Sequence, residues 1–141
     1  MTKNNKLIKT IISSLEKLDI DKKDIFLYQN ICLFLIDWKN CIDNGLKVSN
    51  FDWFISEEGF PEYKNNTLKN ICSSYKHINE KEKKVINYVL SKAQTYTKNK
   101  IIHITKSTYP LITQDYGPIN IKQKAVEYKL YHLSKEKFIA I

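Results

Sequence analysis

The sequence predicts a mainly α-helical fold, a compact bundle of about five to six helices with a short β-strand or hairpin after the second helix. Apolar residues recur at helical spacing in several segments. The 141 residues include only 3 glycines and 3 prolines, which are too few turn formers for an all-β fold with many hairpins. The segment 51–55 alone combines aromatic residues with strand spacing. We expect residues 1–141 to form a single domain.

The first two helices are expected over residues 4–18 and 22–44. The first carries its apolar residues on one stripe. The second contains the run Ile31–Ile36, which is apolar all round and typical of the buried centre of a bundle. Its end is expected at Asn44-Gly45 because glycine commonly follows the last helical residue.

The segment after this helix is expected to form a strand and a turn. Phe51, Trp53 and Ile55 would share one face of the strand. Glu58-Gly59-Phe60-Pro61 has the composition of a turn, and a modest helix is expected over residues 63–74.

The C-terminal half is expected to contain three further helices. Asn79 and Glu82 form a capping-box pattern, Tyr109-Pro110 should end a short helix, and Asn120 should cap the last helix. The expected elements are helices over 79–95, 100–107 and 120–133, a loop over 114–118, and a strand or frayed end over 138–141.

Cysteine usage and hydropathy favour an intracellular, non-membrane protein. The odd set Cys32, Cys41 and Cys72 has neither disulfide-like nor metal-ligand spacing, so we expect reduced thiols and neither metal nor cofactor. The longest apolar run, Ile31–Ile36, is far shorter than the roughly 20 residues of a membrane span. The polar start resembles no signal peptide, which predicts a cytoplasmic location.

The charge of the chain suggests a nucleic-acid-binding alternative. The net charge is +8, and residues 61–141 carry 15 lysines against 6 acidic residues. Lysines interleaved with tyrosines could bind a nucleic-acid backbone and stack bases; the candidates are Lys84, Lys92, Lys98, Lys124 and Lys129. Against this hypothesis, the chain has no arginine, the preferred residue for bidentate phosphate contacts. Ordinary solvated faces explain the same pattern.

A protein-binding surface is the leading hypothesis. Tryptophan is enriched at binding hot spots, and an adjacent acid could pair with a basic partner. The candidate partner-binding residues are Asp37, Trp38, Trp53, Phe54, Gly59, Phe60 and Pro61. The competing interpretation packs the tryptophans in the core and has Asp37 cap or bridge local amides. No catalytic motif is found, because the sequence has no phosphate loop, nucleophile elbow or metal-ligand spacing; we expect no enzyme.

The order of these segments resembles the Panacea (SocA-like) antitoxin domain family. The resemblance begins with Leu33-Phe34-Leu35-Ile36-Asp37-Trp38-Lys39, Asn44-Gly45 and Phe51-Asp52-Trp53-Phe54. It continues through Glu58-Gly59-Phe60-Pro61, the helix with Glu80 and Glu82, Ile104-Thr105-Lys106-Ser107-Thr108-Tyr109-Pro110, and Ile121 with Ala125-Val126-Glu127-Tyr128. It covers roughly residues 25–130. The family turn is usually Gly-Pro, whereas Phe60 here separates Gly59 from Pro61.

The resemblance implies an antitoxin-like domain that neutralises a cognate toxin by direct binding or by delivery to a protease. Family members also occur in phages and mobile elements. The alternative is therefore a phage or mobile-element inhibitor or regulator, acting on a host defence protein or on nucleic acid through the basic C-terminal half. The expected partner is a toxin or host factor, with homo-oligomerisation left open.

Overall fold

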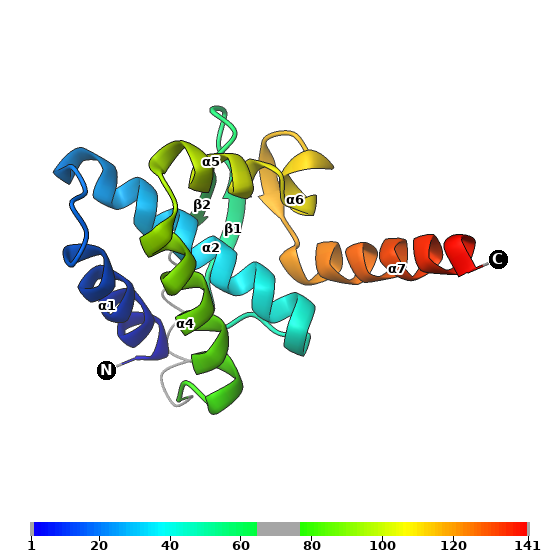
Figure 1. The fold of residues 1–141 in the computed structure, drawn as a ribbon, viewed down its shortest axis with the longest axis horizontal. Helices are drawn as coiled ribbons and strands as arrows, with labels where there is room; N and C mark the ends of the chain where they lie inside the picture. Colours follow the sequence, from blue (N-terminus) through cyan, green and yellow to red (C-terminus); the bar gives the residue numbers. More distant parts are fainter. Residues whose placement is uncertain (1, 65–76, 141) are drawn as a thin grey trace.

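A central helix, α2 (Ile25–Asn44), organises the fold (Figure 1). The computed structural model describes residues 2–64 and 77–140, without the side chains of residues 134–140. The run Ile31–Ile36 is almost wholly buried, as its apolar character predicts. Helices α1, α4 and α7 and strand β2 all contact α2, so α2 forms the core against which the other elements pack.

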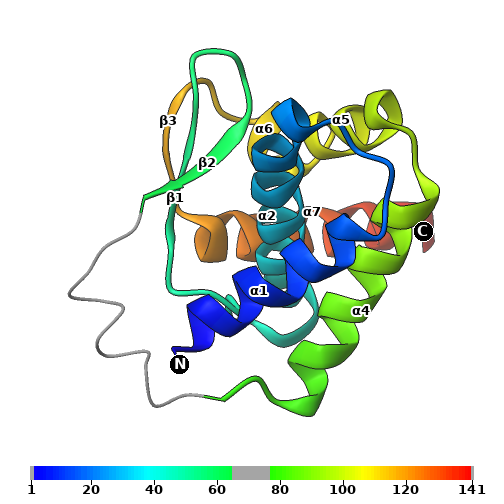
Figure 2. The same cartoon turned by 90° about the vertical axis from the view of Figure 1, so that its left-hand side faces the viewer.

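The predicted fold class is confirmed, because the structure is mainly helical with a small antiparallel sheet after the second helix. A 3₁₀ turn, η1 (Lys22–Asp24), leads into α2. The other described helices are α1 (Lys3–Glu16), α4 (Glu80–Thr95), α5 (Lys98–Lys106), α6 (Tyr109–Ile112) and α7 (Ile121–Ala140). Figure 2 shows α1 and α4 on one side of α2 and the sheet on another.

The helix ends follow local sequence signals. Gly45 has a φ of 80°, a left-handed conformation that favours glycine, and its amide donates to the Cys41 carbonyl at the end of α2. The predicted capping box is present at α4, where the Asn79 side chain accepts from the Glu82 amide and the Glu82 carboxylate accepts from the Asn79 amide. Asn120 likewise accepts from the Gln123 amide in the first turn of α7.

The sheet has three short antiparallel strands in the order β2-β1-β3. They are β1 (Asp52–Ile55), β2 (Pro61–Lys64) and β3 (Gly117–Ile119). Phe51, Trp53 and Ile55 are buried, which confirms their predicted shared face. β3 pairs Ile119 with Trp53, and this pairing joins the C-terminal half of the chain to the hairpin.

Several predicted element boundaries are wrong. Tyr63 lies in β2 because it pairs with Trp53, whereas the rest of the predicted 63–74 helix, residues 65–74, lies outside the described residues. Pro110 occupies the first turn of α6, where its missing amide costs nothing. The predicted loop 114–118 contains the start of β3. Helix α7 continues seven residues past the predicted end at 133, to Ala140.

Helix α7 extends away from the other helices toward the C-terminus (Figure 1). Its first turns pack on α2 and α6. Among the described residues, no helix has the length and apolar character needed to cross a membrane.

Candidate functional site

Asp37 lies at the centre of a buried hydrogen-bonding network, which we call the Asp37 hub (Asp37, Val48, Ser49 and Trp53). The Asp37 side chain has no solvent exposure. Its Oδ1 accepts from the backbone amides of Val48 and Ser49 at 2.9 and 2.8 Å. Its Oδ2 accepts from the Ser49 hydroxyl and, at 2.8 Å, from the Trp53 Nε1–H. The carboxylate therefore ties α2 to the following loop and to β1.

Aromatic packing surrounds the hub. The rings of Trp53 and Phe34 meet edge to face at 5.5 Å, and Trp53 meets Tyr63 at 5.8 Å. Trp38 packs edge to face on Tyr128, 5.6 Å away, and thereby joins α2 to α7. Both tryptophans are buried.

These positions overturn most of the predicted docking face. Asp37, Trp38, Trp53 and Pro61 are buried and so do not form an exposed docking face. The physical reason is that each polar atom of Asp37 already has donors inside the fold, while the tryptophan rings fill the space between α2, the sheet and α7. The structure agrees instead with the competing interpretation, in which the tryptophans pack in the core and Asp37 bridges local amides.

The tip of the hairpin retains part of the predicted surface. Phe54, Gly59 and Phe60 are half-exposed, and the Lys106 ammonium lies 4.5 Å from the centroid of the Phe60 ring. β1 is the central strand of the sheet, so its backbone cannot serve as an edge for an added partner strand. A role of these three residues in partner binding stays a prediction.

The five lysines predicted for nucleic-acid binding do not gather into one site. Lys84 and Lys92 lie on α4, and Lys98 begins α5 and pairs with Asp24 at 3.0 Å. Lys124 and Lys129 lie on α7, where Lys124 Nζ donates to the Thr113 hydroxyl at 3.1 Å. They are spread over three helices, and Lys98 and Lys124 already make polar contacts with other side chains of the protein.

The outer face of α7 presents an apolar surface that the sequence interpretation missed. We call Val126, Leu130 and Leu133 the α7 stripe; their exposures are 52%, 59% and 55%. At 3.6 residues per turn, these residues lie on one face, opposite the face that Ile121 and Ala125 bury. The spacing i, i+4, i+7 is visible within the predicted helix 120–133, but the sequence alone does not show that the fold leaves this face exposed.

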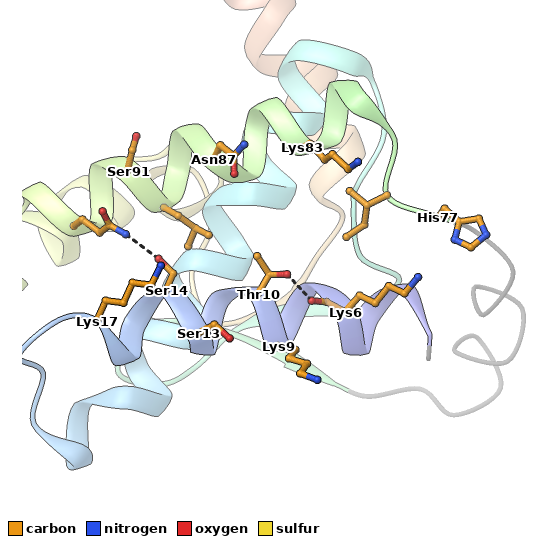
Figure 3. Close-up of a pocket in the computed structure, with 13 residues that line it drawn as sticks. Lys6, Lys9, Thr10, Ser13, Ser14, Lys17, His77, Lys83, Asn87 and Ser91 are labelled. Carbon is orange, nitrogen blue, oxygen red and sulfur yellow. Dashed lines mark hydrogen bonds between the residues drawn. The ribbon is translucent and has the colours of Figure 1, made fainter.

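A second feature missed in the sequence is a groove of about 920 Å³ between α1 and α4. Figure 3 shows its two walls, which carry mainly lysine, hydroxyl and amide side chains. Lys6, Lys9, Thr10, Ser13 and Lys17 recur at helical spacing on α1. Facing them on α4 are Lys83, Asn87, Ser91 and Gln94. Only the packing of α4 beside α1 turns the α1 pattern into one wall of a groove.

An apolar pocket of about 290 Å³ lies between α2, α4 and α5. Trp38, Val89 and Ile101 belong to its lining, and Tyr88 lies at its rim beneath the Lys39 ammonium, 4.5 Å from the ring centroid. Trp38 thus lines a hollow that could admit a small apolar group.

The described cysteines and histidines do not assemble a nucleophilic or metal site. Burial raises the pKa of the Cys32 thiol to about 12. Burial, and secondly the Asp37 carboxylate, raises the pKa of Cys41 to about 12. Both thiols are therefore protonated and poorly reactive near neutral pH. Within residues 2–64 and 77–133, no group of three histidine, cysteine or acidic side chains could hold a metal ion.

Comparison with family models, curated proteins and solved structures finds no match for this chain in any of the three.

Proposed function

We propose that this protein is an antitoxin-like binding module that docks a protein partner on the outer face of α7. The observation that carries the proposal is the exposed α7 stripe, three large aliphatic side chains on one face of α7. The C-terminal end of this helix projects from the body (Figure 1). Exposed apolar patches of this kind are typical of interaction sites. The antitoxin-like role rests on the resemblance of residues 25–130 to the Panacea family.

Charge supports a partner with an acidic rim. Lys122 and Lys129 are exposed and border the α7 stripe. The whole of α7 carries five lysines and two glutamates. A second copy of the same helix would place lysines against lysines. A partner with acidic side chains around an apolar surface would complement the lysines of α7. The expected partner therefore places an apolar surface on Leu130 and carboxylates beside the bordering lysines.

The inner face of α7 supports the same proposal. Trp38 and Tyr128 anchor α7 to α2 through their edge-to-face contact at 5.6 Å. A helix fixed at its base offers its outer residues in a preorganised geometry, which lowers the entropic cost of binding.

The product of an adjacent gene is the partner to test, by isothermal titration calorimetry of the two purified proteins. We expect a one-to-one complex with a Kd below about 1 μM, corresponding to about 8 kcal/mol. Co-expression should also relieve the growth defect that the partner causes alone. Absence of a complex with the product of either adjacent gene, or of any growth defect, would overturn the antitoxin-like proposal.

Leu130→Glu tests the docking surface separately from the function. It should raise the Kd of the complex at least about 30-fold. The substitution replaces an apolar contact that contributes about 2 kcal/mol to the binding free energy with a charge that binding would bury. Leu46→Glu is the matched control, since Leu46 is 60% exposed and Leu130 is 59% exposed. A complex that both variants leave intact would keep the function and remove α7 as its site.

A further inference from the structure

We propose that the groove between α1 and α4 binds the phosphate backbone of single-stranded nucleic acid. The groove belongs to a different part of the molecule from the α7 stripe, because α1 and α4 lie on one side of α2 and the free end of α7 extends from the other (Figure 1). The proposal is therefore independent of the protein-binding function.

The lining of the groove has the charge that a polyanion needs. In the described part of the chain, four lysines are among the 13 residues that line the groove, and none of these residues is acidic. Within the described part of the chain, no acidic side chain lies within ion-pair distance of Lys6, Lys9 or Lys17. Lys83 pairs with Glu80 at 3.2 Å in an exposed contact, which is a weak interaction.

The Glu82 carboxylate is engaged by groups other than the groove lysines. Glu82, one residue before Lys83, is buried and bonded to Lys3 at 2.5 Å and to the Asn79 amide. This ion pair joins the start of α1 to the start of α4 and engages the Glu82 carboxylate. Glu82 therefore does not neutralise the lysines of the groove.

The positions of the lysines indicate a chain of phosphates. Figure 3 places Lys17 near one end of the groove and Lys6 and Lys83 toward the other, while Lys9 points away from α4. Lys6 and Lys17 are eleven residues apart on α1, or about 16 Å along the helix axis at 1.5 Å per residue. Amino groups that far apart cannot converge on one phosphate, but they can contact successive phosphates of one strand.

The other lining residues suit backbone contacts without reading the bases. Ser13, Asn87 and Gln94 can donate hydrogen bonds to phosphate oxygens. Gln94 also bonds to the Ser14 hydroxyl at 3.1 Å, which links the two walls. No phenylalanine, tyrosine or tryptophan is among the described lining residues, so stacking on the bases is limited to the imidazole of His77. Binding should accordingly be insensitive to sequence and steeply dependent on salt.

The test is fluorescence anisotropy of the full-length protein with labelled 15-nucleotide single strands of DNA and RNA, the matching duplex, and inorganic phosphate as competitor. With three lysines engaged, the logarithm of the association constant should fall with the logarithm of salt concentration at a slope of about −2. The variant Lys6→Gln/Lys17→Gln/Lys83→Gln should raise the Kd at least about tenfold and flatten this slope toward zero.

The matched control is Lys84→Gln/Lys92→Gln/Lys129→Gln, which removes three exposed lysines outside the groove and changes the net charge equally. It should retain most of the affinity and the slope. Circular dichroism must show all proteins folded. Equal losses in both variants, no binding to single strands at low salt, or preference for the duplex or for inorganic phosphate would each overturn the proposal.

Discussion

The Asp37 hub and the outer face of α7 differ in how far their side chains are buried and bonded within the fold. Asp37 and Trp53 have the residue types of a binding hot spot, but the carboxylate accepts four hydrogen bonds and the indole lies in an aromatic cluster. Leu130 has an ordinary helical residue type and yet is more than half exposed. The difference shows that hot-spot residue types mark a binding surface only where the fold leaves their groups without internal partners.

The largest effect is expected from Asp37→Ala. The substitution leaves two buried amides, a hydroxyl and an indole N–H without their acceptor, at about 1–3 kcal/mol for each unsatisfied group. We expect the free energy of unfolding, measured by urea denaturation, to fall by at least about 4 kcal/mol. Asp43→Ala, on the same helix, should cost no more than about 0.5 kcal/mol, because it breaks only the surface pair with Lys39.

Asp37→Asn extends this test if the alanine variant fails to fold. It keeps one acceptor oxygen and turns the other site into a donor that faces the Ser49 hydroxyl and the Trp53 indole. An intermediate loss of stability is expected. Wild-type stability in both variants would contradict the structural role of the hub.

Lys3→Met should give the next largest effect. It removes the partner of the buried Glu82 carboxylate, which lies 2.5 Å from the Lys3 ammonium. Breaking a buried ion pair costs about 3 kcal/mol or more. Lys83→Met is the control, since it breaks the exposed pair with Glu80 and should change stability by less than about 0.5 kcal/mol. Equal effects of the two substitutions in thermal and urea unfolding would show that α1 and α4 are not joined by a buried pair.

The buried thiols should make stability fall at high pH. Unfolded cysteines lose their protons near their ordinary pKa of 9, whereas Cys32 and Cys41 in the folded chain hold theirs until about pH 12. Above pH 9 the folded state therefore binds more protons, and the free energy of unfolding decreases as pH rises from 9 toward 12.

Thiol labelling checks the same groups at pH 8. A Cys72→Ser variant restricts the count to the two described cysteines, which should react with a disulfide reagent only after denaturant is added. Rapid reaction of either thiol in the native protein would show that this part of the core opens readily.

The smallest effect on stability is expected from Leu130→Glu. Substitutions at exposed positions usually change the free energy of unfolding by no more than about 0.5 kcal/mol. Leu46→Glu, at an equally exposed leucine, should behave alike in the same urea titration. A loss above about 2 kcal/mol for Leu130→Glu alone would mean that Leu130 packs within the fold or in a dimer, and would remove the contrast with the Asp37 hub.

Local sequence signals were sufficient for much of the fold. Gly45 ends α2, and Asn79 and Glu82 cap α4. The alternation of Phe51, Trp53 and Ile55 marks the buried face of β1 and of the residue before it. Each of these signals acts within a few residues. Strand β3 escaped prediction because its three residues are defined by pairing with β1, more than 60 positions earlier.

The functional surfaces were harder to predict for the same reason. The donors to Asp37 come from residues 11 to 16 positions away, and no local pattern reveals that they converge. The groove needs α1 and α4 side by side, although Lys6 and Lys83 are far apart in sequence. The net charge of the N-terminal half does not reveal the groove either. The acidic residues of that half offset its lysines in the sum, but they lie outside the groove lining.

Hydrogen exchange of the Trp53 indole proton tests most directly whether the Asp37 hub is sealed. In the wild-type protein in heavy water, we expect the Trp53 Nε1–H resonance to persist for hours, with protection approaching that of global unfolding, because the group is buried and bonded to Asp37 at 2.8 Å. Exchange within minutes, as in a solvent-exposed tryptophan, would show that the hub opens to solvent and would return Asp37 and Trp53 to the candidate docking surface.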